Sequence, residues 1–190
     1  MIAPPGPVLS EEQATAVRRW KTGHHVFHLQ LTVMNSALDE ALAALRAGER
    51  EQLTARLREL RLLYDAATVS MKYAGSFPSH EYTTLIRPSM DEPFVGAGFS
   101  GLFNSEHAAM LGGLRQLRRE VRLQLKRDGE PAELRAASDE LWSAQARNRR
   151  NHMFVCQRFV PDGRSLLKQF YERTGGHPPG AHPCPAPEQR

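Results

Sequence analysis

Apolar residues recur at intervals of three and four along most of this chain, and that spacing limits its fold more than any other feature. In the first such segment the apolar positions are Val17, Trp20, Phe27, Leu31, Met34, Leu38, Ala41 and Leu45. This spacing places an apolar stripe along one face of an α-helix. No stretch of useful length alternates apolar and polar residues, so strands are not expected. The pattern therefore predicts an all-α fold, a helical bundle of four main helices.

Capping and turn residues predict where the helices begin and end. Ser10-Glu11-Glu12-Gln13 is a capping-box pattern that starts the first helix, and Gly48 ends it. The other main helices are expected over residues 49–73, 105–126 and 131–160. Ser105 is expected to cap the helix over 105–126, and a short helix is expected over 164–173. Residues 75–104 are rich in Gly, Pro and Ser but also carry five aromatic residues. They are expected to form one long ordered loop, because aromatic side chains can bury surface there.

Composition excludes several classes of protein. Hydrophobic residues make up 41% of the chain and charged residues 24%, as in soluble globular proteins. The net charge is +4, but arginines alternate with glutamates along helical segments, which predicts solvated helix faces and no nucleic-acid binding. The sequence contains no run of 18 uncharged apolar residues, so no membrane span is expected. Residues 1–7 lack the pattern of a signal peptide, and two cysteines are too few for a disulfide scaffold, so a cytoplasmic location is expected.

The first helix carries three histidines, His24, His25 and His28. His24 stands seven residues from both Val17 and Leu31, so it should point inward. Three interpretations are open: one satisfied core histidine with two surface ones, a distal acid/base, or a pair of ligands for a transition metal.

The last main helix places a histidine and a cysteine one turn apart. Its apolar positions include Leu134, Leu141, Val155 and Phe159. They put His152 on or beside the apolar face, and Cys156 follows on the same face, roughly 6 Å along the helix. Imidazole suits haem iron, and a thiol at this distance can bind the same metal or reach a vinyl at the porphyrin edge. The common Cys-x-x-Cys-His attachment motif is absent. The spacing alone is also compatible with packing.

Four segments resemble tryptophan 2,3-dioxygenase-like proteins, in the same order along the chain. Residues 147–158 resemble the proximal helix, whose histidine binds haem, with His152 in that place. His24-His25-Val26-Phe27-His28-Leu29 resembles the distal helix, and Gly98-Phe99-Ser100-Gly101 a distal loop. Arg173-Thr174-Gly175-Gly176 resembles the loop that closes over an amino-acid substrate. The resemblance covers residues 20–180 and implies a tryptophan 2,3-dioxygenase-like helical fold.

Within that superfamily the chain most resembles haem-dependent aromatic oxygenases that hydroxylate tyrosine or 3-methyltyrosine in natural-product biosynthesis. Arg87-Pro88-Ser89-Met90 is similar to their distal loop. The methyltyrosine type carries a His-xn-His-x-x-x-Cys motif with a c-type haem. The resemblance implies His107 and His152 as the two iron ligands and Cys156 as the covalent tether, although the gap of 44 residues between the histidines is long for the motif.

The resemblance implies a haem-dependent oxygenase or peroxygenase that uses O₂ or hydrogen peroxide on an aromatic amino acid. His24 or His25 would serve as the distal acid/base, and Arg87 would pair with a carboxylate or a haem propionate. The resemblance implies that Arg87, Ser100, Thr174 and Gly175 bind the substrate. The arginine that binds the substrate carboxylate in the dioxygenases has no counterpart in this sequence. The domain layout would be a flexible N-terminus (1–9), a haem-binding helical domain (10–173) and a substrate loop with tail (174–190).

Other interpretations stay open at this stage. His24 is the rival of His107 as second iron ligand. A non-catalytic haem protein for electron transfer or sensing, or a metal-free helical interaction module, also fits the residues. The length of the first helix favours a homo-oligomer.

Overall fold

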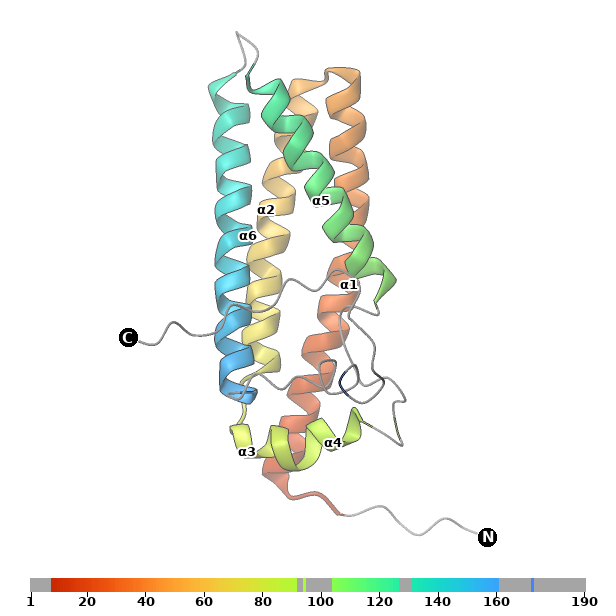
Figure 1. Cartoon of the computed structure of the whole chain (residues 1–190), viewed down its shortest axis with the longest axis vertical. Helices are drawn as coiled ribbons and strands as arrows, with labels where there is room; N and C mark the ends of the chain where they lie inside the picture. The colour runs from red at the N-terminus through yellow and green to blue at the C-terminus, as the bar shows by residue number, and fades with distance from the viewer. Residues whose placement is uncertain (1–7, 92–93, 95–103, 127–130, 161–171, 173–190) are drawn as a thin grey trace.

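The computed structural model describes residues 8–91, 94, 104–126, 131–160 and 172, and these contain helices and no strand. Four long helices form the body of the molecule (Figure 1): α1 (Glu11–Ala47), α2 (Arg50–Ala74), α5 (Ser105–Gln124) and α6 (Ala132–Phe159). The predicted all-α bundle of four main helices is confirmed. None of the described helices is both long and apolar enough to span a bilayer.

The ends of α1 follow the predicted capping chemistry. The Gln13 backbone N–H donates to Ser10 Oγ at 3.2 Å, and the Ser10 N–H donates to Gln13 Oε1 at 3.1 Å. Gly48 ends the helix with a left-handed φ of 74°, which glycine adopts without strain. The cap of α5 is Asn104 and not Ser105, because the Asn104 side chain accepts from the backbone N–H of His107 at 3.0 Å.

The predicted long loop over residues 75–104 is wrong for its first half. Residues 79–89 form one continuous helical segment, α3 (Ser79–Glu81), the π-helical turn η1 (Tyr82–Ile86) and α4 (Arg87–Ser89). Pro78 is the N-cap of α3, where a missing N–H costs nothing, whereas Pro88 lies in the last turn of the continuous segment, where its missing N–H removes one backbone hydrogen bond. The segment crosses the lower end of the bundle (Figure 1). Residues 95–103, and the expected short helix apart from residue 172, lie outside the described residues.

The main core runs along the upper part of the bundle and takes residues from all four long helices. Its most buried large side chains are Leu31, Met34, Leu38, Leu53, Leu57, Leu60, Leu117, Val121, Leu134 and Leu141. α2 is the central element, since it packs against α1 on one side and α6 on the other. α5 packs on α1 and makes few direct contacts with α6.

A second, smaller apolar cluster closes the lower end. Its buried members are Ala16, Phe77, Ile86, Met90 and Phe159. The Phe159 ring lies 5.0 Å from that of Phe77 and 4.9 Å from that of Tyr82, between ring centroids. The cluster joins the beginning of α1, the segment 79–89 and the end of α6, which holds these three elements in place around the site described next.

Candidate functional site

His152 and Cys156 occupy one face of the last turns of α6, as the sequence predicted. The Cys156 Sγ lies 3.7 Å from His152 Nδ1 and 3.8 Å from Nε2. The thiol is half-buried and forms no disulfide. The imidazole keeps an exposed edge, but surrounding protein displaces water from it and lowers the pKa of His152. A neutral imidazole beside a thiol offers two soft-to-borderline donors to one metal.

The start of α5 brings a second histidine toward this turn. His107 is half-buried, and its electrostatic interaction with His152 is the second cause, after burial, of the lowered pKa of His152. Its ring centroid lies 6.3 Å from that of Phe27 on α1. The capping residue Asn104 also contacts α1, where its amide lies 3.4 Å from His28 Nδ1. The structure therefore places His107 near His152 and fixes the first turn of α5 against α1.

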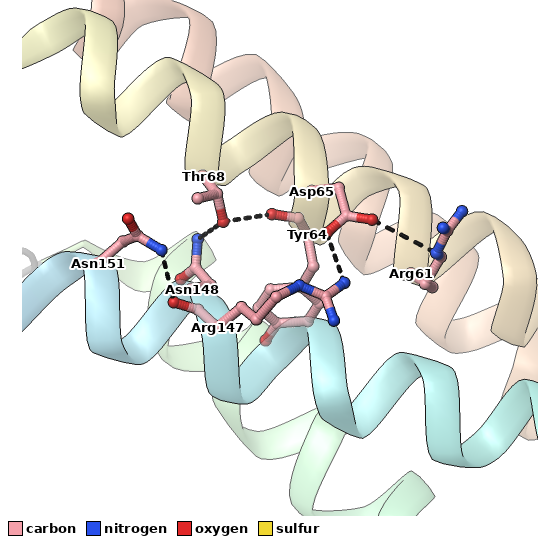
Figure 2. A network of polar contacts seen from close by, with 7 residues as sticks. All are labelled: Arg61, Tyr64, Asp65, Thr68, Arg147, Asn148 and Asn151. Atoms are coloured by element: carbon pink, nitrogen blue, oxygen red, sulfur yellow. Dashed lines mark hydrogen bonds and ion pairs between the residues drawn. The ribbon is translucent and has the colours of Figure 1, made fainter.

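Polar contacts with α2 set the position of α6 just before His152 (Figure 2). The Asn148 amide donates to Thr68 Oγ1 at 3.0 Å, and Thr68 in turn donates to the Tyr64 carbonyl at 3.0 Å. The Arg147 guanidinium donates to Asp65 Oδ1 at 2.9 Å, while Asp65 Oδ2 lies 3.3 Å from Arg61 Nε. Asn148 is half-buried and stands one turn before His152, so its hydrogen bond has the larger part in orienting that turn.

Arg158 fastens the other end of the same stretch. Its guanidinium donates to the Gly75 carbonyl at 3.0 Å and to the Phe77 carbonyl at 2.6 Å. It also lies 5.3 Å from the centroid of the Phe159 ring. His152 and Cys156 are thus held between two anchors, Asn148 before them and Arg158 after them.

Tyr82 belongs to the site although the sequence did not single it out. Burial raises the pKa of Tyr82, a hydrogen bond and the charge of Arg87 oppose that rise, and the nearby Cys156 adds to it. Tyr82 and Arg87 are five residues apart, which is the wrong spacing for one face of an α-helix. The π-turn closes an i to i+5 hydrogen bond and brings both to one side. A search for apolar residues at the α-helical period of 3.6 could therefore not have placed Tyr82 beside Arg87.

The histidines predicted as distal acid/base differ in their surroundings. His24 is half-buried and its ring lies 4.4 Å from that of Trp20. Its Nδ1 lies 2.7 Å from the Trp20 carbonyl, which can only accept, so Nδ1 carries the proton and Nε2 is the acceptor nitrogen of the neutral ring. Burial lowers the pKa of His24, and the charge of His25 acts in the same direction, against the hydrogen bond to Trp20. His25 is exposed.

The predicted substrate-binding residues are only partly described. Arg87 is half-buried beside Tyr82. Ser100, Thr174 and Gly175 lie outside the described residues. The candidate site therefore draws its described residues from the lower end of α6, the start of α5 and the segment 79–89.

Comparison with known proteins identifies the family. The chain matches the family described as SfmD 3-methyl-L-tyrosine peroxygenase over residues 2–141. It is 29% identical over 164 residues to the 3-methyl-L-tyrosine peroxygenase of Streptomyces lavendulae, covering 84% of this chain and 41% of that protein. The chain thus spans less than half the length of this relative. No solved structure matches. The family match takes in α1, α2, α5 and the first part of α6, so the chain belongs to the SfmD 3-methyl-L-tyrosine peroxygenase family.

Proposed function

We propose that this protein is a peroxygenase that hydroxylates the ring of a tyrosine derivative of the 3-methyl-L-tyrosine class, with a haem held by His152 and tethered through Cys156. The observation that carries the proposal is the α6 turn, where Sγ lies within 3.8 Å of both imidazole nitrogens. The family membership supports the reaction class, since the relative from Streptomyces lavendulae is a 3-methyl-L-tyrosine peroxygenase.

The donor set is chemically suited to haem. His107 and His152 would supply imidazole nitrogens of the kind that haem iron binds, and Cys156 would supply a thiol that can form a thioether with the porphyrin. Among the described residues, these three side chains do not bring their ligand atoms within 4.8 Å of one another, so they do not form a compact site for a bare ion. When bound, haem supplies the redox-active iron that activates peroxide.

His152 and His107 are the proposed axial ligands. The lowered pKa of His152 keeps its imidazole neutral near pH 7, so a nitrogen lone pair is available to iron. His107 stands in the first turn of α5, and that turn is held by the Asn104 cap. His107 would hold the iron from the α5 side, and the bound and released positions of its side chain would have to differ by only a few kcal/mol for the site to admit peroxide.

His24 is the better candidate for the distal acid/base. Its hydrogen bond to Trp20 favours the tautomer with the proton on Nδ1, and burial lowers its pKa, so the neutral imidazole would act as a base toward peroxide and would return the proton to the leaving oxygen. The exposed His25 acts on His24 through its charge. Ring hydroxylation consumes one peroxide and releases one water, so the protein has only to move protons and hold the substrate.

Arg87 and Tyr82 are the proposed polar contacts of the substrate among the described residues. A guanidinium pairs well with a carboxylate of an amino acid or of a haem propionate. Ser100, Thr174 and Gly175 are proposed to complete the binding of the amino-acid head group, in line with the resemblance of their segments to substrate loops.

The test is the haem content and activity of three variants. His152→Ala should purify nearly colourless and lose hydroxylation of 3-methyl-L-tyrosine with peroxide. Cys156→Ser should keep some haem but lose the added haem mass under denaturing conditions. Cys184→Ser is the matched control and should keep the covalent haem. Pyridine haemochrome spectra and intact-mass spectrometry measure both properties. A His152→Ala protein with full haem and an unchanged spectrum would contradict the proposal.

A non-catalytic bis-histidine haem protein is the second candidate, and the proximity of His107 to His152 favours it. The two functions differ in their response to substrate. An enzyme should show a Soret shift on addition of 3-methyl-L-tyrosine and form product with peroxide, whereas a carrier should stay low-spin and form none.

A further inference from the structure

Three side chains that the proposed function does not use meet at the lower end of the molecule. Glu12 lies in the first turn of α1, and His80 and Glu81 lie in α3. One ligand atom from each falls within 4.8 Å of the other two. The His80 Nε2 lies 3.2 Å from Glu81 Oε1. Glu12 and His80 are 68 positions apart in sequence, so the tertiary fold brings the cluster together.

Glu81 carries a second, independent sign of a ligand. Its side chain is 6% exposed, and its Oε2 is buried with no hydrogen-bond partner. A buried carboxylate oxygen without a donor is costly to keep. Protonation of His80 would satisfy Oε1 through the ion pair but would leave Oε2 bare. A cation among the three side chains removes that cost, because it binds a carboxylate oxygen directly.

We propose that Glu12, His80 and Glu81 bind a first-row divalent transition-metal ion of the Zn²⁺ type. One imidazole and two carboxylates favour this class, since Mg²⁺ and Ca²⁺ take oxygen ligands almost alone. Two ligands about 2.1 Å from a tetrahedral Zn²⁺ lie about 3.4 Å apart. The pair of His80 Nε2 and Glu81 Oε1 already stands at that separation, at 3.2 Å. Glu12 completes the triad with a small side-chain rotation, which its exposed position allows.

The ion would join the start of α1 to α3. Phe77, just before α3, and Ala16, one turn after Glu12, both belong to the lower apolar cluster. The ion therefore braces the elements that carry Tyr82 and Arg87, while sharing no ligand with His107, His152 and Cys156. Its expected role is structural, and it is independent of whether haem binds.

Zn²⁺ binding by the untagged protein tests the proposal. The wild-type chain should bind one more Zn²⁺ than His80→Ala or Glu12→Gln, in isothermal titration and in equilibrium dialysis. Each variant should weaken this site roughly tenfold or more. Zn²⁺ should raise the melting temperature of the wild type and not of the two variants. Co²⁺ should give the intense visible absorption of a tetrahedral site in the wild type alone.

The variants are chosen so that folding does not confuse the result. His80 and Glu12 are exposed, and Glu11→Gln is the matched control, because Glu11 is the neighbouring first-turn acid outside the cluster. The control should bind Zn²⁺ as the wild type does. Equal Zn²⁺ stoichiometry and melting shift in all four proteins would overturn the proposal. So would loss in His80→Ala with no change in Glu12→Gln, since a site that joins α1 to α3 requires Glu12.

Discussion

Tyr64 is the residue at which three helices meet. It is buried at 5% exposure on α2, and its hydroxyl donates to Met110 Sδ on α5 at 3.5 Å. Burial raises the pKa of Tyr64 to about 12, while a hydrogen bond from Gln145 on α6 and the charge of Arg149 partly oppose the rise. The phenol is therefore held in its neutral form well above the pH at which a free tyrosine ionises.

This shift predicts an alkaline loss of stability. The folded-state pKa lies above the unfolded value of 10, so the folded chain holds the proton longer, and stability falls as pH rises from about 10 to about 12. Two pKa units correspond to about 2 to 3 kcal/mol. Tyr64→Phe should lower the free energy of unfolding by about 1 kcal/mol at pH 7, because its hydrogen bonds are lost. Above pH 10 the free energy of unfolding of this variant should fall less steeply with pH than that of the wild type. Urea unfolding of both proteins from pH 7 to 11.5 measures this. Parallel curves would show that Tyr64 is not the group responsible.

At the scale of single elements, α1 and α2 approach each other closely at Gly23. A Cβ built on Gly23 would stand 2.4 Å from the Ala74 Cβ and 2.8 Å from the Ala74 Cα. The Ala74 atoms that such a Cβ would meet belong to the backbone as well as to the side chain, so they cannot rotate away. Gly23 has no side chain, and this allows α1, the predicted distal helix, to pack closely against the end of α2. Gly23 directly precedes His24, so the same contact sets the position of His24.

Gly23→Ala should destabilise the protein by about 1 to 3 kcal/mol, because the two helices must move apart. Gly112→Ala is the matched control, since a Cβ at Gly112, also inside a helix, meets nothing within 4 Å. The control should be neutral or more stable by about 0.5 to 1 kcal/mol, as alanine favours the helix. Thermal and urea unfolding compare the two. Equal effects of both substitutions would contradict this account of the α1–α2 contact.

The elements that sequence predicted well are those whose ends carry a local chemical signal. Ser10, Gln13 and Gly48 determine α1 within the chain itself, and the four long helices follow from their apolar stripes. The segment 79–89 was missed because Pro and Ser signal loops on average, while here Pro78 is a helix N-cap and Pro88 lies within the last turn of a continuous helical segment. The π-turn hid Tyr82, since no regular period places it beside Arg87. The proximity of His107 to His152 depends on how α5 crosses the bundle, which only tertiary packing decides.

At the scale of the whole molecule, α5 is the least supported long helix. It packs on α1 and makes few contacts with α6, whereas α2 is covered by α1 and α6 (Figure 1). The proposed haem would join His107 on α5 to His152 on α6, and so would link two helices that make few direct contacts with each other.

Hydrogen exchange should show this link. In haem-free protein the amides of α5 should exchange faster than those of α2, because local opening of α5 exposes less core. Haem should slow exchange in α5 more than in α2, and His107→Ala should remove that difference while haem stays bound through His152. Mass-spectrometric exchange on peptides of both helices measures it. If haem protects α5 equally in His107→Ala, then His107 is not the ligand on α5.

The division of α6 into two halves bears on how such a protein can diversify. Leu134, Ala137, Leu141 and Ala144 insert into the main core, whereas from residue 145 to 160 only Phe159 is buried. Substitutions at the exposed positions of this half therefore disturb the main core less than substitutions in the packed half do. A lineage can sample new side chains around His152 without first acquiring compensating stability. The match to the family model ends at residue 141, within the packed half, so the half of α6 that carries His152 lies outside the matched residues.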